Sequence, residues 1–272
     1  MINKSLFLTL TFACLAPAVQ THAEGYINEN MVVFVSEEDP AQSPWKEKPQ
    51  CNAVSKSISK GLYENQYTFQ NGNPLTSVFL SKTKIKSGEC ENLVQFPDNI
   101  QGTGVFESFY PNGKTHSRIE YQDGQYEGKL QFWFANGLKQ QESQIINGMN
   151  DGDYKIWHPN GQIAMSSKYK QDIPVGMRQR WYESGDPWTY VRFDNGRMVG
   201  ELKQWYRNGK LERQGQYKNG VREGVYKSWY ESGKPEAELA YSHGNIKAAQ
   251  CWNTSGVLKT EKSCIQSFAD EQ

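Results

Sequence analysis

The chain has 272 residues, of which 37% are hydrophobic and 13% aromatic, and its 30 basic residues balance its 30 acidic ones. A chain without net charge has no long-range field to attract nucleic acid or an anionic membrane surface, so the composition excludes both as partners. Because Tyr, Trp and Phe supply much of the apolar surface, it also favours strands over helices.

The first 23 residues predict export. Lys4 gives a basic start, Ser5–Val19 is mostly apolar, and Thr21-His22-Ala23 offers small residues where a signal peptidase reads the chain. We expect cleavage after Ala23. The apolar run is too short to span a bilayer, so the mature protein should have no integral membrane segment. Its expected location is across the inner membrane, in the periplasm or at the cell surface.

Cys14 offers an alternative processing site, as the lipidated first residue of a lipoprotein. Ala13 before it is small, as such a site requires, but Phe12 is bulky and Thr11 stands where an aliphatic residue is preferred. These residues favour cleavage after Ala23 over lipidation.

Residues 24–103 show no repeat in phase with the rest of the chain, and we interpret them as an N-terminal capping region of strand and loop. Met31–Ser36 and Tyr67–Phe69, with the turn Asn71-Gly72, predict strands that cover the open end of a sheet. Residues 257–272 are expected to form a C-terminal cap and tail.

Four cysteines remain after the signal: Cys51, Cys90, Cys251 and Cys264. In an oxidising compartment they indicate two disulfides, for which three pairings are possible. The first two precede the periodic part of the chain and the last two lie at its end. We therefore expect the pairs Cys51–Cys90 and Cys251–Cys264.

Residues 104–256 form an array with a period of 24 residues, visible in three columns of glycine. The columns are Gly104, Gly128, Gly152, Gly176, Gly200 and Gly224; Gly113, Gly137, Gly161, Gly185, Gly209 and Gly233; and Gly124, Gly148, Gly196, Gly220 and Gly244, with Asp172 in the gap. An aromatic pair such as Trp133-Phe134 or Trp205-Tyr206 lies between the first two columns. Columns that stay in phase over six repeats indicate a repeat architecture.

Each repeat is predicted to be two short strands joined by a tight turn, such as Lys129–Phe134 and Leu138–Ile145. The turn glycine often follows asparagine, as in Asn136-Gly137, and this dipeptide accepts positive φ at low cost. Apolar and polar residues alternate along the second strand, as in an antiparallel sheet with one face toward water. The predicted fold class is all-β, an elongated single-layer antiparallel sheet of successive 24-residue β-hairpin repeats.

Two copies of the repeat carry a family resemblance. Gly128–Gly137 reads Gly-Lys-Leu-Gln-Phe-Trp-Phe-Ala-Asn-Gly, and Gly200–Gly209 reads Gly-Glu-Leu-Lys-Gln-Trp-Tyr-Arg-Asn-Gly. Both resemble the MORN-repeat variant of bacterial proteins and look most like the YwqK-type proteins, which are commonly labelled antitoxins. The resemblance extends over residues 104–256 and implies a twisted sheet of hairpins. The antitoxin role is implied by association, since a fold does not fix a function.

The residues give little support to catalysis. The histidines of the mature chain, His116, His158 and His243, lie in different repeats, too far apart along a linear array to share a metal ion. Carboxylates such as Glu107 and Glu183 recur in polar columns and turns, as expected of solvated residues. Neither a nucleophile elbow nor a phosphate-binding glycine loop is present. We expect a non-enzymatic protein without metal or cofactor.

The fourth repeat departs from the pattern and is the candidate binding site. Trp188 and Tyr190 in its second strand would lie on the face that is polar in the other repeats, and Arg178 and Arg180 replace apolar residues of its first strand. Trp, Tyr and Arg together are typical of protein-binding hot spots. In the alternative interpretation, the N-terminal segment folds back over this face.

The leading interpretation is an exported protein that binds another protein through its sheet, with neutralisation of a toxin as its sharpest version. The alternative is a glycan- or cell-wall-binding module of the envelope, because exposed tryptophans with interleaved Lys and Gln also bind sugars. A third interpretation, an envelope hydrolase, has little support from the residues.

Overall fold

The computed structural model describes residues 51–87 and 99–269. Contacts divide the chain into two units, of which Met1–Val33 lies outside the described residues and Phe34–Gln272 contains all of them. The predicted signal, the predicted strand Met31–Ser36 and Cys90 also lie outside the described residues.

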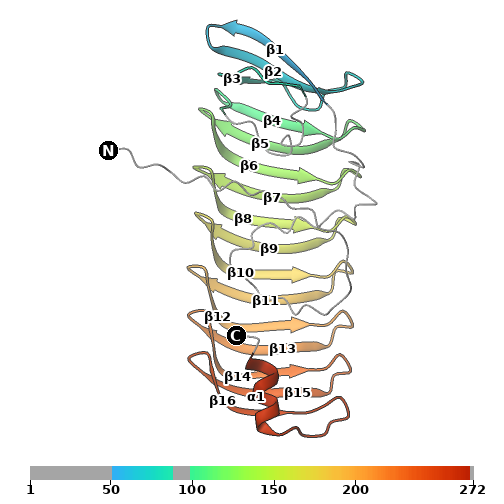
Figure 1. Ribbon diagram of the computed structural model, residues 1–272, viewed down its shortest axis with the longest axis vertical. Coiled ribbons are helices and arrows are strands. Elements are labelled where there is room, and N and C mark those ends of the chain that lie inside the picture. The colour runs from blue at the N-terminus through green and yellow to red at the C-terminus, as the bar shows by residue number, and fades with distance from the viewer. Residues whose placement is uncertain (1–50, 88–98, 270–272) are drawn as a thin grey trace, which may run out of the picture. The chain divides into compact units, whose positions relative to one another are not determined.

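The main sheet has 13 antiparallel strands that follow one another in chain order from β4 to β16, and it does not close on itself (Figure 1). This confirms the prediction of successive hairpins in one sheet. Its strands are β4 (Gly104–Phe109), β5 (Thr115–Gln122), β6 (Gln125–Trp133), β7 (Lys139–Ile146), β8 (Met149–Trp157), β9 (Ile163–Lys170), β10 (Ile173–Trp181), β11 (Pro187–Asp194), β12 (Arg197–Trp205), β13 (Leu211–Lys218), β14 (Val221–Trp229), β15 (Pro235–Ser242) and β16 (Asn245–Cys251).

Two kinds of turn join these strands. At one end, two-residue turns hold both residues at positive φ, as at Asn147 (52°) and Gly148 (76°). At the other end, only the glycine has positive φ, as at Gly137 (91°). The asparagine before that glycine has another role than the predicted one. The Asn136 Oδ1 accepts a hydrogen bond from the Leu138 backbone, and its Nδ2 donates one to a carbonyl in the next repeat.

From Gly128 onward, the first-column glycines lie inside strands, which corrects the predicted strand Lys129–Phe134. β6 starts at Gln125, and Gly128 lies in a bulge with φ of 108°. Ile119 pairs with Leu130 and Tyr121 with Tyr126, so β6 advances four positions while β5 advances two. The same irregularity recurs in β8, β10, β12 and β14. Glycine adopts this backbone conformation without the steric cost of a Cβ atom.

One face of the main sheet, here called the packed face, carries most of its buried side chains. One of its columns runs through every repeat as Ile119, Ser143, Ser167, Val191, Gly215 and Leu239, all of them buried. The side chain paired with each of these residues on the following strand is larger where the column residue is smaller. Ile119 pairs with Leu130, whereas the smaller Ser143 pairs with the larger Tyr154. Successive repeats therefore keep the face filled with different pairs of side chains.

A second sheet of three antiparallel strands packs against the first strands of the array. It consists of β1 (Cys51–Ser59), β2 (Leu62–Phe69) and β3 (Phe79–Ser81). The predicted strand Tyr67–Phe69 is part of β2. After β2 the chain runs alongside β4, where the Phe109 backbone N–H donates to the Leu75 carbonyl at 2.9 Å. The shared core consists of Cys51, Tyr67, Phe69, Leu75, Phe79, Ile100, Phe106, Ile119 and Tyr121.

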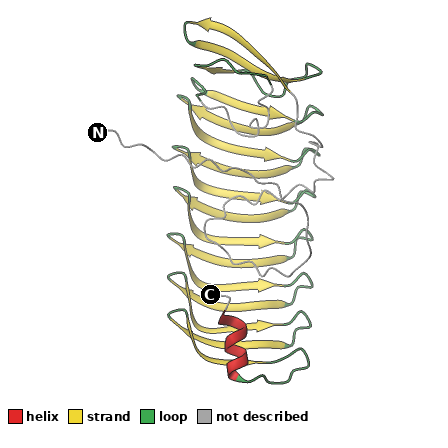
Figure 2. Cartoon of the chain, viewed as in Figure 1, coloured by secondary structure: helices red, strands yellow, loops and turns green. Residues whose placement is uncertain are grey.

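At the other end, the helix α1 (Glu261–Ala269) packs on β14–β16 (Figures 1 and 2). The predicted disulfide Cys251–Cys264 is confirmed and holds α1 to β16, with 5.5 Å between the Cα atoms. Phe268 of α1 joins a core cluster with Leu239 and Tyr241. Cys51 is also disulfide-bonded. Among the described residues, no helix is long and apolar enough to cross a membrane.

Candidate functional site

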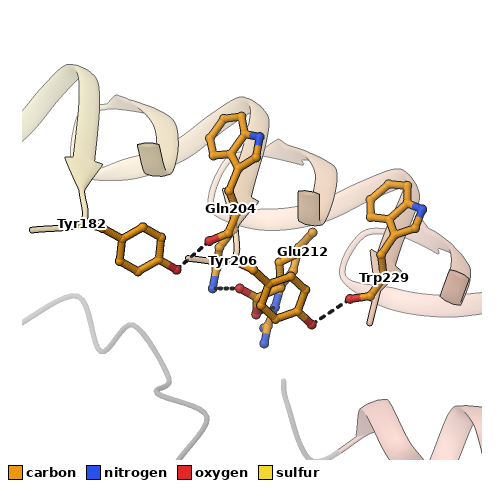
Figure 3. A network of polar contacts seen from close by, with 7 residues as sticks. Tyr182, Gln204, Tyr206, Glu212 and Trp229 are labelled. Carbon is orange, nitrogen blue, oxygen red and sulfur yellow. Dashed lines mark hydrogen bonds and ion pairs between the residues drawn. The ribbon is translucent and has the colours of Figure 1, made fainter. Parts of the chain in front are cut away.

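A ladder of hydrogen bonds positions the aromatic pairs of the repeats. In five of the six pairs, the second residue points along the array and bonds the backbone carbonyl of the next tryptophan in the chain. Figure 3 shows two of these bonds, from the Tyr182 hydroxyl to the Trp205 carbonyl at 2.7 Å and from the Tyr206 hydroxyl to the Trp229 carbonyl at 2.8 Å. Tyr110, His158 and Tyr230 make the corresponding bonds. The sequence showed the aromatic columns but not this contact between repeats.

The ladder yields a paired prediction. Tyr206→Phe removes one hydroxyl and leaves the Trp229 carbonyl without that donor, so we expect a loss of about 1 kcal/mol in the free energy of unfolding. Phe134 holds the same position in the second repeat without a hydroxyl, so Phe134→Tyr should be neutral or slightly stabilising. Urea denaturation of both variants measures this, and equal losses in both would contradict the ladder.

A second bulge decides where Trp188 points. Arg180 pairs with Thr189 and Trp181 with Pro187, which leaves Trp188 as an extra residue between the two pairs. His116 and Glu212 occupy the same bulge position in the first and fifth repeats. An extra residue shifts the alternation of side chains along a strand, and so it brings Trp188 onto the packed face. The expectation that Trp188 lies on the polar face is therefore wrong.

On the packed face, Trp188 belongs to a stack of cations and rings. Its ring stacks on Tyr182 with centroids 5.7 Å apart and planes inclined by 28°. The Arg180 guanidinium lies 5.6 Å from the Trp188 centroid, and the Arg207 guanidinium lies 4.9 Å from the Tyr182 centroid. Guanidinium groups over aromatic rings interact favourably with the negative face of the ring. The stack links the fourth repeat to the turn of the fifth.

Arg178 lies one pleat from Arg180, on the same face. Its guanidinium is 4.4 Å from the Phe193 ring centroid and donates hydrogen bonds to the Ser167 and Tyr169 hydroxyls at 3.3 and 3.1 Å. Burial lowers the pKa of Arg180 from its ordinary value, and the nearby charge of Arg178 lowers it further. The Arg180 guanidinium stays protonated at neutral pH, because an arginine pKa is far above 7.

Tyr190 lies apart from the other three predicted site residues. It pairs with Gln179 in β10 and Lys203 in β12, next to the buried Val191, so its side chain is on the opposite face. The structure therefore brings Arg178, Arg180 and Trp188 together and leaves Tyr190 on the other side of the sheet. Tyr182 and Arg207, which sequence reasoning did not select, complete the cluster. Their regular repeat positions gave no signal of this contact.

The packed face carries charges of both signs. Its paired positions from β4 to β16 hold four arginines, Arg178, Arg180, Arg213 and Arg222, all of them in β10–β14. Its bulge positions in the fifth and sixth repeats hold Glu212 and Glu236. The opposite face carries ion pairs such as Lys227–Glu238 at 3.1 Å and Glu201–Lys203 at 2.9 Å.

A serine and a histidine lie in contact in the first repeat. Ser108 Oγ lies 3.0 Å from His116 Nδ1, but Ser108 is only 2% exposed, so this pair belongs to the core. Within residues 51–87 and 99–269, no three His, Cys, Asp or Glu side chains lie together in a way that could hold a metal ion.

Comparison with known proteins identifies the repeat. The family described as MORN repeat variant matches residues 103–123, 150–171, 198–219 and 222–243. Each matched segment spans one hairpin: β4–β5, β8–β9, β12–β13 and β14–β15. No curated protein matches the chain significantly. These four hairpins are similar to the MORN repeat variant, and they follow the same strand and turn pattern as their neighbours.

Proposed function

We propose that this protein is an exported, non-enzymatic repeat protein that binds another protein through the packed face of its fourth repeat. The supporting observation is the cluster of Arg178, Arg180, Tyr182 and Trp188 in the middle of the array. Arg, Tyr and Trp dominate the energetics of protein interfaces, and hot spots tend to lie near the centre of a contact surface. The predicted signal peptide places the partner in the periplasm or at the cell surface.

The sharpest version of the proposal is an immunity or antitoxin role, in which the partner is a toxin. It is supported by the resemblance of Gly128–Gly137 and its copies to YwqK-type proteins. Co-expression with candidate toxins encoded beside this protein would test it, with survival of the host cells as the result expected of an antitoxin.

Substitutions on the two faces test where the partner binds. Trp188→Ala and Arg180→Ala should each weaken binding by about 2 kcal/mol, roughly a 30-fold rise in Kd, because both remove hot-spot contacts. Tyr190→Ala is the matched control in the same strand and should leave Kd unchanged. Titration calorimetry with the captured partner measures this, with circular dichroism as the check that each variant folds. A loss caused by Tyr190→Ala alone would place the interface on the opposite face.

A glycan-binding module is the second candidate, and the tryptophan column supports it. Trp133, Trp157, Trp181, Trp205 and Trp229 are half-buried on the opposite face and recur every second strand, about 9–10 Å apart. Regularly spaced indole rings suit the stacking of sugar units along an extended polysaccharide. Retention on purified cell-wall glycan, lost in the double variant Trp157→Ala/Trp181→Ala, would favour this function over protein binding.

A further inference from the structure

We propose that the face opposite to the packed face binds a polysaccharide that carries carboxylate groups. The inference rests on glycan binding, the second candidate function, and adds the charge of the glycan and the residues that recognise it. These residues lie on the other side of the sheet from the cluster of Arg178, Arg180 and Trp188, so the site is separate from the proposed protein-binding surface.

A continuous row of paired side chains crosses the opposite face from β4 to β16. Each member pairs with the next one on the adjacent strand, so neighbouring members are one strand spacing apart, about 4.8 Å. The members are, in order, Glu107, Arg118, Gln131, Glu142, Lys155, Ser166, Gln179, Tyr190, Lys203, Gln214, Lys227, Glu238 and Gln250. Glu142 and Glu238 are the carboxylates on either side of the stretch in β8–β14. Within that stretch the charged members are Lys155, Lys203 and Lys227, and the others are hydroxyl or amide side chains.

The tryptophan column runs beside this row. Trp181 follows Gln179 by two positions in β10, and Trp205 follows Lys203 by two positions in β12. Residues two apart in a strand point to the same face, so each of these indole rings has a hydrogen-bonding side chain beside it. Trp205 pairs with the apolar Leu211 on the following strand, so the polar contacts come from the row. A sugar chain along the column would therefore meet a ring and a polar group at every second strand.

Two cations of this face have no counter-charge among the described residues. Lys155 belongs to the row, and Arg192 lies two positions from it in β11, where it pairs with Met177 and is exposed. Within residues 51–87 and 99–269, neither side chain forms an ion pair. Glu142 pairs with Lys155 across β7 and β8, but its carboxylate binds the Lys139 ammonium at 2.6 Å. Both cations are therefore available to an anionic ligand.

The carboxylates that flank the row in β8, β11 and β12 lie beside other cations. The pairs are Asp153–Lys168 at 3.5 Å, Glu201–Lys203 at 2.9 Å and, at the turn end of β11, Asp194 paired with Arg197 on the next strand. These opposite charges balance, so Lys155 and Arg192 leave a local excess of positive charge although the whole chain has none.

Repetition and charge together define the class of ligand. The tryptophans recur every second strand, about 9–10 Å apart, which suits a polymer of repeating sugar units and not the irregular surface of a folded protein. Carboxylates on the sugars would accept charge-assisted hydrogen bonds from Lys155 and Arg192. A nucleic acid carries a charge on every phosphate and requires more cations than these two. The observations favour a carboxylated polysaccharide.

Affinity electrophoresis of the full mature chain tests the inference. Native gels contain either polygalacturonate, which has a carboxylate on each sugar, or hydroxyethyl cellulose, which is uncharged. Three proteins are compared: the wild type, Lys155→Gln/Arg192→Gln, and the control Lys56→Gln/Lys262→Gln, which loses the same charge from exposed positions outside the main sheet. We expect the wild type and the control to bind polygalacturonate at least about tenfold more tightly than hydroxyethyl cellulose, and Lys155→Gln/Arg192→Gln to lose this preference.

The outcomes separate the inference from glycan binding itself. Equal retardation of the wild type by both polymers, or a preference that survives in Lys155→Gln/Arg192→Gln, would mean that a glycan binds without recognition of its charge, and would overturn the inference alone. Retardation by neither polymer would contradict both glycan binding and the inference.

A second measurement needs no variant and covers the case in which Lys155→Gln/Arg192→Gln fails to fold. The Kd of the wild type for polygalacturonate should rise at least about tenfold between about 0.05 M and 0.5 M salt, because exposed ion pairs are screened. The Kd for hydroxyethyl cellulose should stay the same. A Kd for polygalacturonate that does not change with salt would show that its carboxylates are not recognised.

Discussion

Gly215→Val should destabilise the array by about 3 kcal/mol. A Cβ atom at position 215 would lie 2.3 Å from Cδ2 of Tyr226, a distance that real contacts do not reach. Tyr226 cannot move away freely, because it is 3% exposed and packs against Tyr241 and the Arg222 guanidinium. Overpacking of a buried site costs about 1–3 kcal/mol, and valine adds two further methyl groups to the clash. Urea denaturation followed by tyrosine and tryptophan fluorescence measures the loss.

A second substitution, taken from the fourth repeat, should restore the stability of this variant. In the fourth repeat, Val191 and Leu202 occupy the positions that Gly215 and Tyr226 hold in the fifth. The double variant Gly215→Val/Tyr226→Leu recreates that pair and should recover most of the lost stability. Recovery well below half of the loss would show that the two positions do not share one packing volume. The comparison separates steric conflict from any general intolerance of the strand to valine.

Acidification should destabilise the first repeat through His116. Burial lowers the pKa of His116 from its ordinary value of 6.5 to about 4. The unfolded chain therefore takes up a proton between pH 6.5 and pH 4, where the folded protein does not. The free energy of unfolding is unaffected by this group above pH 6.5 and falls as the pH drops toward 4, by about 3 kcal/mol in total.

His116→Gln isolates this effect, since it removes the titrating group at a partly polar site. His116 lies 4.9 Å from Tyr110 and 5.9 Å from Phe132, measured between ring centroids, so the variant also loses packing at neutral pH. The test therefore compares how steeply the free energy of unfolding changes with pH, and not its value at neutral pH. Stability measured at several values between pH 7 and pH 4 should decline more steeply for the wild type than for His116→Gln. Parallel curves would contradict the lowered pKa.

Local chemistry explains why the hairpin array could be predicted. The pairs Asn147-Gly148 and Asn195-Gly196 do adopt the positive φ values that their residue types favour. Each such turn determines the hairpin around it, and the same hairpin recurs every 24 residues along the chain. The disulfide Cys251–Cys264 followed from compartment and spacing in the same way. Short-range preferences and a regular period were sufficient for these features.

The candidate site could be predicted only in part, because its residues meet across strands. The sequence selected Arg178, Arg180 and Trp188 since they break the repeat pattern, and the structure brings them together. It also grouped Tyr190 with them by counting alternate residues. That count fails at the bulge, where one extra residue moves Trp188 to the packed face while Tyr190 stays on the other.

The sequence by itself determined the order of the hairpins and the positions of their turns, because these depend on residues close together in the chain. The tertiary structure decided which face each strand presents at its bulges, as at Gly128 and Trp188. It also decided the bonds that join repeats, such as Tyr182 to the Trp205 carbonyl. Those features depend on register between neighbouring strands and on volumes shared across them, as between Gly215 and Tyr226. The pattern of residue types along one strand specifies neither its register with the neighbouring strand nor the volume that their side chains share.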